Sequence, residues 1–252
     1  MALPLASAGA AVAPLRGELR YGLELMRLMA QREFHAPARR AGAPAVLLVP
    51  GFMAGDQSLL VLAAWLRRRG SRVARSGVWL NTDCAERVVE GIERRLAQLA
   101  EKDGRRVVVL GQSRGGELAR VLAVRNPERV STLVMLGSPV LDPLSVGPGV
   151  LRAVRSVAWL GDRGVPGMFS HECGDGPCCA SFRDDLGAPL PEGVRGVSFY
   201  SRSDGIVAWQ ACVDPHAENI EVESSHTGMS VNADVYRLLA QTLDREEVAW
   251  TG

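Results

Sequence analysis

One segment of this 252-residue chain constrains the fold more than any other: residues 105–116, which read RRVVVLGQSRGG. The apolar run Val107–Leu110 is short and mostly β-branched, which is typical of a strand buried on both faces. The residues after Gly116 continue as an apolar helix, so the Gly-x-Ser-x-Gly turn joins a strand directly to a helix. A turn this tight strains the backbone at Ser113 and favours glycine where neighbouring segments approach. We therefore expect the Ser113 hydroxyl to be exposed above a sheet, at a helix N-terminus.

Strand and helix candidates alternate along most of the chain. Short apolar or β-branched runs predict strands at 43–50, 72–78, 107–110, 129–136, 197–201 and 219–223. Apolar residues spaced by three and four predict helices at 57–69, 88–99, 117–124 and 232–243. Alternation of this kind predicts an α/β fold: a mostly parallel central sheet with right-handed crossovers and helices on both faces. A chain of 252 residues, 47% of them hydrophobic, is long enough to bury one large core.

Two regions stand outside this alternation. In the first, apolar residues spaced by three and four predict an amphipathic helix that packs on the protein's own body: Leu15, Leu19, Leu23, Met26 and Met29. In the second, between about 141 and 195, glycine and proline recur, with one helix candidate at 150–160. We therefore divide the chain into an N-terminal tail and helix, 1–43, and a main domain, 44–252, that carries the insertion.

Two strand candidates are each followed by a residue that acyl transfer requires. Asp204 lies in a Ser-Asp-Gly turn after the strand at 197–201, and His226 follows the strand at 219–223. A serine hydroxyl is a poor nucleophile at neutral pH, so it needs a base such as histidine, and the histidine needs an acid to orient it. Residues after parallel strands meet at the carboxyl edge of the sheet. Ser113, Asp204 and His226 are therefore the predicted catalytic triad.

Asp142 is the alternative acid, because it closely follows the strand at 129–136. Its Asp-Pro pairing is typical of a residue that starts a loop. Asp204 is therefore the preferred acid.

The strand, turn and helix around Ser113, and the order Ser113, Asp204, His226, resemble the α/β-hydrolase superfamily, in particular small bacterial lipases and carboxylesterases. The resemblance spans about residues 44–243. It implies an α/β-hydrolase fold in which the insertion forms a cap or lid over the site.

The resemblance also implies an oxyanion hole made by two main-chain N–H groups, those of Phe52 and Arg114. Phe52 follows the first strand candidate in the loop Gly51–Gly55. The family often has His-Gly at this point, and this chain has Pro50 before Gly51.

The function implied is that of a serine hydrolase that cleaves carboxylic esters through an acyl-enzyme, with no cofactor and no metal. Acyltransferases, thioesterases and peroxidases use the same site with a different acceptor and remain alternatives. A ligand-binding protein that kept the fold without turnover is a further alternative.

The charge balance favours a small-molecule partner. Lys and Arg number 29 and Asp and Glu 28, which leaves a formal charge of +1 and no electrostatic argument for nucleic acid. No apolar run reaches the roughly 18 residues that span a bilayer, so stable membrane insertion is not expected. Residues 1–13 are small and apolar but lack a basic start, so we expect a tail and a cytoplasmic protein, with secretion as the alternative. The oligomeric state stays open.

The five cysteines are an odd number, so they cannot all pair within the chain. His171, Cys173, Cys178 and Cys179 form a cluster in sequence, but no second Cys-x-x-Cys pair accompanies it, and adjacent cysteines fit poorly around one tetrahedral ion. Free thiols are therefore expected, including that of Cys84, with a disulfide between the insertion and Cys212 as the alternative.

Overall fold

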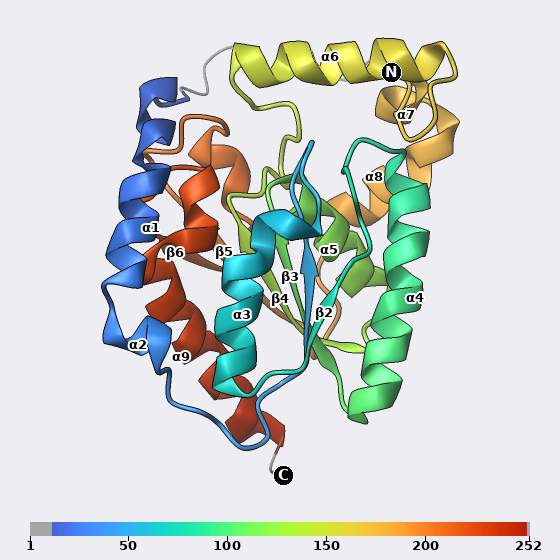
Figure 1. The fold of residues 1–252 in the computed structure, drawn as a ribbon. Helices are drawn as coiled ribbons and strands as arrows, with labels where there is room; N and C mark the ends of the chain where they lie inside the picture. The colour runs from blue at the N-terminus through green and yellow to red at the C-terminus, as the bar shows by residue number, and fades with distance from the viewer. Residues whose placement is uncertain (1–11, 251–252) are drawn as a thin grey trace.

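The computed structural model describes residues 12–250, which form one sheet covered by helices on both faces (Figure 1). The strands are β1 (Val46–Val49), β2 (Val73–Arg75), β3 (Val107–Gln112), β4 (Val130–Leu136), β5 (Arg195–Tyr200) and β6 (Glu218–Glu221). Their order in the sheet is β2-β1-β3-β4-β5-β6, and every neighbouring pair is parallel. The predicted fold class is confirmed.

The longer helices are α1 (Tyr21–Met29), α3 (Leu60–Arg69), α4 (Ala85–Asp103), α5 (Arg114–Arg125), α6 (Pro148–Asp162), α8 (Ala180–Gly187) and α9 (Ala233–Trp250). Short helical segments are η1 (Leu15–Arg20), α2 (Arg32–His35), η2 (Asp56–Leu59), α7 (Glu172–Asp175), η3 (Pro177–Cys179), η4 (Trp209–Cys212) and η5 (Thr227–Val231). Helices α4, α5 and α8 cover one face of the sheet, and α1, α3 and α9 cover the other (Figure 1). None of these described helices has the length and apolar character needed to cross a bilayer.

Alternation along the strands divides the core between the two faces. Leu47 and Val49 pack against α4 and α5, whereas Val46 and Leu48 pack against α3 and α9. Successive side chains of a strand point to opposite faces, so a strand covered on both sides needs apolar residues at every position. This requirement explains why the central strands are continuous apolar runs.

The N-terminal helix packs on the domain with the opposite face from the one predicted. Leu19 is 85% exposed and Met26 63% exposed, whereas Glu24 is only 3% exposed. The predicted apolar contact is therefore wrong. The physical reason is that Glu18 and Glu24 accept hydrogen bonds from N–H groups in the turns after β5 and β6, and Leu28, one turn after Glu24, is buried in the core, so this side of the helix is the one held inward. Residues 1–11 of the predicted tail lie outside the described residues.

The insertion begins with α6, which crosses above the carboxyl edge of the sheet (Figure 1). Both ends of this crossing are attached to the domain: the Gly147 N–H donates to the Ile206 carbonyl, and the Phe169 N–H donates to the Thr82 carbonyl. The later helix α8 was not predicted. Its residues Phe182 and Leu186 are buried in the core beside α5, so the end of the insertion serves as the crossover helix between β4 and β5.

A buried ion pair connects α5 to the segment after η4. Arg120 Nε lies 2.8 Å from Asp214 Oδ2, and the two side chains are 3% and 0% exposed. Arg120 also donates to the Ala188 carbonyl. Removing one partner of a buried pair leaves the other charge without compensation.

We therefore predict that Arg120→Met lowers the free energy of unfolding by about 3–5 kcal/mol. Urea denaturation followed by circular dichroism measures the loss. The control is Arg237→Met, which removes an exposed pair with Asp234 and should cost less than about 1 kcal/mol. Equal losses in the two variants would contradict the assigned importance of the buried pair.

Candidate active site

Ser113 occupies a strained turn between β3 and α5. Its backbone has φ 53° and ψ −129°, a region that residues with side chains rarely adopt. Close packing around the turn excludes larger residues: a Cβ on Gly111 would overlap the Gly115 carbonyl, and one on Gly116 would overlap the Ser138 hydroxyl. The predicted backbone strain and the need for glycine are both present.

Asp204 and His226 come together from the turns after β5 and β6. Asp204 Oδ2 lies 2.6 Å from His226 Nδ1, and the two residues are 2% and 4% exposed. The other oxygen of Asp204, Oδ1, accepts hydrogen bonds from the N–H groups of Ile206 and Val207, both at 2.8 Å. These donors hold the carboxylate in one orientation toward the imidazole.

Ser113 and His226 belong to adjacent parts of the same edge. Gln112, the residue before Ser113, donates from Nε2 to the His226 carbonyl at 3.2 Å. Between the turns lies Gly137, where a Cβ would come within 3.1 Å of His226 Nδ1 and 3.3 Å of Asp204 Oδ2. The structure thus brings the three predicted residues to one place at the carboxyl edge.

Two glutamates, Glu18 of η1 and Glu24 of α1, accept hydrogen bonds from the turn that contains His226. The sequence did not predict either contact. Glu18 accepts from the N–H groups of Gly205, His226 and Thr227 at 2.8–3.1 Å. The Glu24 carboxylate accepts from the Ser225 N–H and hydroxyl at 2.8 and 3.0 Å. The signal for these contacts was weak: a turn rich in N–H and hydroxyl donors, Ser224 to Thr227, with nothing in the sequence to indicate acceptors about 200 residues earlier.

Burial and charge act in opposite directions on His226. Burial lowers its pKa, but the charge of Asp204, the hydrogen bond to Asp204 and the charge of Glu18 outweigh burial, so the pKa is raised above its ordinary value. Burial also raises the pKa of Glu18, but the hydrogen bonds from the N–H groups of His226, Thr227 and Gly205 lower it by more. The pKa of Glu18 therefore lies below its ordinary value. Glu18 therefore remains ionised at neutral pH.

The loop after β1 lies against the Ser113 turn. A Cβ on Gly51 would meet the Cβ of Ser113 at 3.2 Å, so the two backbones are close. Within residues 12–250, the N–H groups of Phe52 and Arg114 donate to no other main-chain group outside regular helices and strands. The loop that carries Phe52 and the start of α5 at Arg114 therefore lie side by side at the Ser113 turn.

The side chain of Arg114 turns away from this region. It donates to the carbonyls of Asn81 and Asp83 at 2.9 and 2.7 Å, and its guanidinium lies 5.1 Å from the centre of the Phe169 ring. This side chain therefore holds loop 81–83 and the end of the α6 crossing together.

The alternative acid, Asp142, does not contact His226. Its Oδ1 accepts from the Leu144 N–H at 3.2 Å, in a local turn of the insertion. The imidazole pairs with Asp204.

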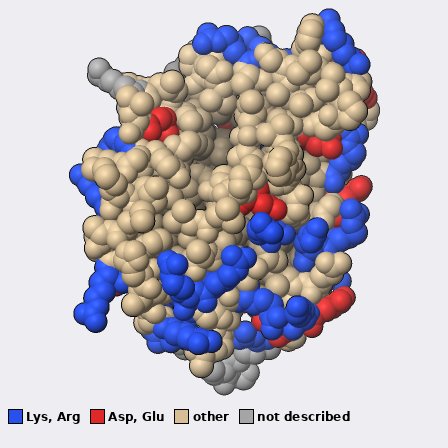
Figure 2. Space-filling view, in the orientation of Figure 1, with Lys and Arg blue, Asp and Glu red and all other residues tan. Residues whose placement is uncertain are grey.

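The surface around α6 carries little charge. Figure 2 shows a hollow below α6, bordered mostly by side chains that are neither basic nor acidic, while Lys and Arg gather lower on the same face.

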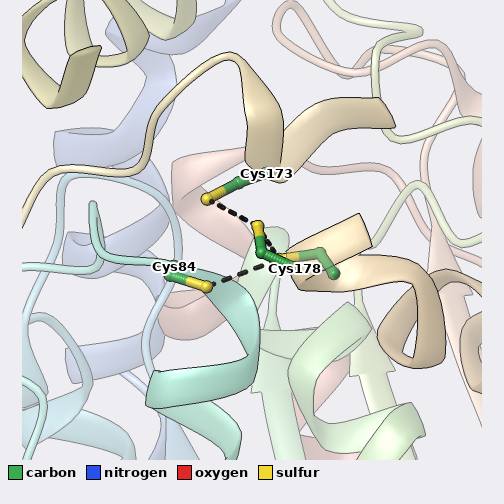
Figure 3. A group of neighbouring side chains, drawn as sticks. Cys84, Cys173 and Cys178 are labelled. Atoms are coloured by element: carbon green, nitrogen blue, oxygen red, sulfur yellow. Dashed lines mark hydrogen bonds between the residues drawn. The ribbon is translucent and has the colours of Figure 1, made fainter. Parts of the chain in front are cut away.

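Four cysteines cluster where the segment after α6 meets the start of α4. Cys84, Cys173, Cys178 and Cys179 have their sulfur atoms within 4.8 Å of one another (Figure 3). All five cysteines are free, and the expected alternative of a disulfide to Cys212 is not seen. Burial raises the pKa of Cys84 to about 11. Cys84 was missed as a member because it is 89 residues from Cys173 in sequence and belongs to the start of α4.

Comparisons with known proteins agree with this architecture. A family model described as the alpha/beta hydrolase fold matches residues 73–176. Among curated protein sequences, none matches the chain.

Three solved structures illustrate the shared fold. The mature lipase BlEst2 of Bacillus licheniformis is 16% identical, with a TM-score of 0.60 over 82% of this chain and 95% of the lipase. A metagenomic carboxyl esterase, MGS0156, is 14% identical, with a TM-score of 0.61 over 98% of this chain and 96% of the esterase. A soluble variant of the monoglyceride lipase from Saccharomyces cerevisiae is 12% identical, with a TM-score of 0.55 over 81% of this chain and 85% of the lipase.

Identities this low establish the fold and not the reaction. The chain has the α/β-hydrolase fold, and the family model relates it to the α/β-hydrolase superfamily.

Proposed function

We propose that this protein is a serine hydrolase of carboxylic esters, with Ser113 as nucleophile, His226 as general base and acid, and Asp204 as the orienting acid. The observation that carries the proposal is the buried Asp204–His226 pair, 2.6 Å apart, beside a strained Ser113 turn. Such a combination is costly to maintain in a fold that does not use it.

In the first half of the reaction, the Ser113 oxygen attacks the ester carbonyl while His226 Nε2 takes the hydroxyl proton. Nδ1 is occupied by Asp204, so Nε2 carries the lone pair that acts as base. The oxyanion that forms accepts hydrogen bonds from the N–H groups of Phe52 and Arg114. His226 then returns the proton to the leaving alcohol, and the acyl group remains on Ser113.

In the second half, a water molecule attacks the acyl-enzyme, with His226 again accepting the proton. The carboxylic acid leaves, and Ser113 recovers its hydrogen. Each step requires the imidazole to gain and lose one proton, which Asp204 assists by stabilising the charged form.

The substrate proposed is an uncharged ester, consistent with the largely neutral surface below α6. Helix α6 acts as a cap whose half-buried residues Val150, Leu151 and Val154 offer apolar contacts to an acyl chain. Phe52 and Phe169, with ring centres 6.2 Å apart, link the oxyanion loop to the end of this cap.

The first test concerns the nucleophile. A fluorophosphonate probe should label one residue, Ser113, and Ser113→Ala should abolish labelling and reduce turnover of p-nitrophenyl esters to the uncatalysed background. Peptide mass spectrometry locates the label. Labelling that persists in Ser113→Ala would exclude this serine as the nucleophile.

The second test separates the two candidate acids. Asp204→Asn should reduce kcat by about four orders of magnitude, because His226 loses its charge partner and its tautomer. Asp142→Asn is the matched control and should keep most activity, since Asp142 only accepts a local hydrogen bond from Leu144. The reverse result would move the acid to Asp142.

The third test uses the raised pKa of His226. Only the neutral imidazole accepts a proton, so kcat/KM should fall with decreasing pH through a value above 6.5, the ordinary value for histidine. Removing the nearby negative charge with Glu18→Gln should lower the His226 pKa and move this acidic limb to lower pH. The pH profile is measured with p-nitrophenyl acetate.

Glu223→Gln provides the control for this test, because Glu223 is exposed and pairs with Arg20 at the surface. Its acidic limb should coincide with that of the parent protein. A Glu18→Gln profile that moves to higher pH, or does not move, would contradict the assigned charge interaction.

A further inference from the structure

We propose that Cys84, Cys173, Cys178 and Cys179 form a structural zinc site that fastens the insertion to the start of α4. The inference is independent of the proposed ester hydrolysis. It concerns a part of the molecule that the candidate active site does not use.

The sulfur positions fit one tetrahedral ion. Cys84 lies 3.4 Å from Cys179, Cys178 lies 3.5 Å from Cys173, and Cys178 lies 3.7 Å from Cys179, all measured between sulfur atoms (Figure 3). Four thiolates at a Zn–S distance of about 2.3 Å have sulfur atoms about 3.8 Å apart. All four sulfur atoms lie within 4.8 Å of one another, so they surround a single ion with small adjustments.

The adjacent residues Cys178 and Cys179 both direct their sulfur atoms toward the centre of the cluster, 3.7 Å apart. Cys178 and Cys179 end the 3₁₀ segment η3, where successive side chains are about 120° apart around the axis. In a strand they would point to opposite faces. The 3₁₀ turn therefore removes the objection that the sequence raised against two neighbouring ligands.

The surroundings suit a thiolate site with net negative charge. The Ser170 hydroxyl lies 3.7 Å from the Cys173 sulfur, within hydrogen-bonding distance. The guanidinium groups of Arg87 and Arg114 interact electrostatically with the cluster. Groups that donate to ligand sulfurs and balance their charge are the usual second layer of such sites.

Access also fits. Cys84 and Cys179 are buried, at 5% and 1% exposure, Cys173 is half-buried and Cys178 is exposed. An ion can enter from the Cys178 side and lose its water ligands as the four thiols lose their protons. Four sulfur ligands in a closed site are typical of structural zinc, which leaves no position for substrate.

The position explains what the ion would stabilise. Cys84 begins α4, directly after the loop 81–83 that Arg114 holds, and the other three ligands follow the end of the α6 crossing. A bound ion would therefore fix α7 and η3 against the main domain. Because no residue of α7 is fully buried, metal coordination supplies an attachment that packing does not.

The test measures metal in the full-length protein purified without chelator or metal-affinity steps. Elemental analysis should find about one zinc per chain, and an intact mass under denaturing conditions should correspond to five reduced cysteines. Replacement with Co²⁺ should produce the intense visible absorption of tetrahedral cobalt thiolates. Cys178→Ala should lose the metal; because Cys178 is exposed, this variant preserves the packed core.

Cys212→Ala is the matched control, since this buried cysteine lies outside the cluster, and it should retain one zinc. Ser113→Ala should also retain zinc, which separates this result from the fate of the proposed reaction. A metal-free protein that gives no cobalt absorption, or a mass showing disulfides among the four cysteines, would overturn the proposal. Iron in place of zinc would overturn the identity of the metal.

Discussion

The contact between Asp204 and His226 depends on groups from outside the sheet. Each residue lies in a turn after one of the last two strands of the sheet, β5 or β6, and such a turn has N–H groups that the strands do not satisfy. Glu18 accepts three of these N–H groups, one of which belongs to His226 itself. The N-terminal helix therefore does more than cover the sheet: its carboxylates bind the two turns that must meet.

This arrangement explains why the helix exposes its apolar stripe. Leaving a leucine or methionine in water forfeits about 1.5–3 kcal/mol of burial. Leaving several N–H donors without acceptors in a buried turn costs about 1–3 kcal/mol for each donor. The two carboxylates accept from seven donors on the turns from Gly205 to Thr227, and Leu28, one turn after Glu24, is buried in the core. This side of the helix is therefore the one that packs on the domain.

Much of the fold and the site could be predicted from sequence, because the signals involved are local. Continuous apolar runs identify strands buried on both faces, and the glycines around Ser113 report a packing requirement that the structure meets at Gly111 and Gly116. The order of the three site residues, each after a strand, predicted their shared edge.

What could not be predicted depends on contacts between distant segments: the pairing of Glu18 with residues about 200 positions later, and the approach of Cys84 to Cys173, Cys178 and Cys179. Helix α8 was missed for a related reason, since its burial comes from α5 and not from a strong periodicity of its own.

The central claim is that the reaction passes through an acyl group on Ser113, and rapid-quench mass spectrometry tests it most directly. The protein is mixed with excess p-nitrophenyl acetate and quenched in acid within the first turnover, and its peptides are then analysed. The account predicts a transient acetyl group on the peptide that contains Ser113, formed with a burst of p-nitrophenol and lost at the rate of steady-state turnover. Turnover without an acylated protein, or an acyl group that accumulates on another residue, would contradict it.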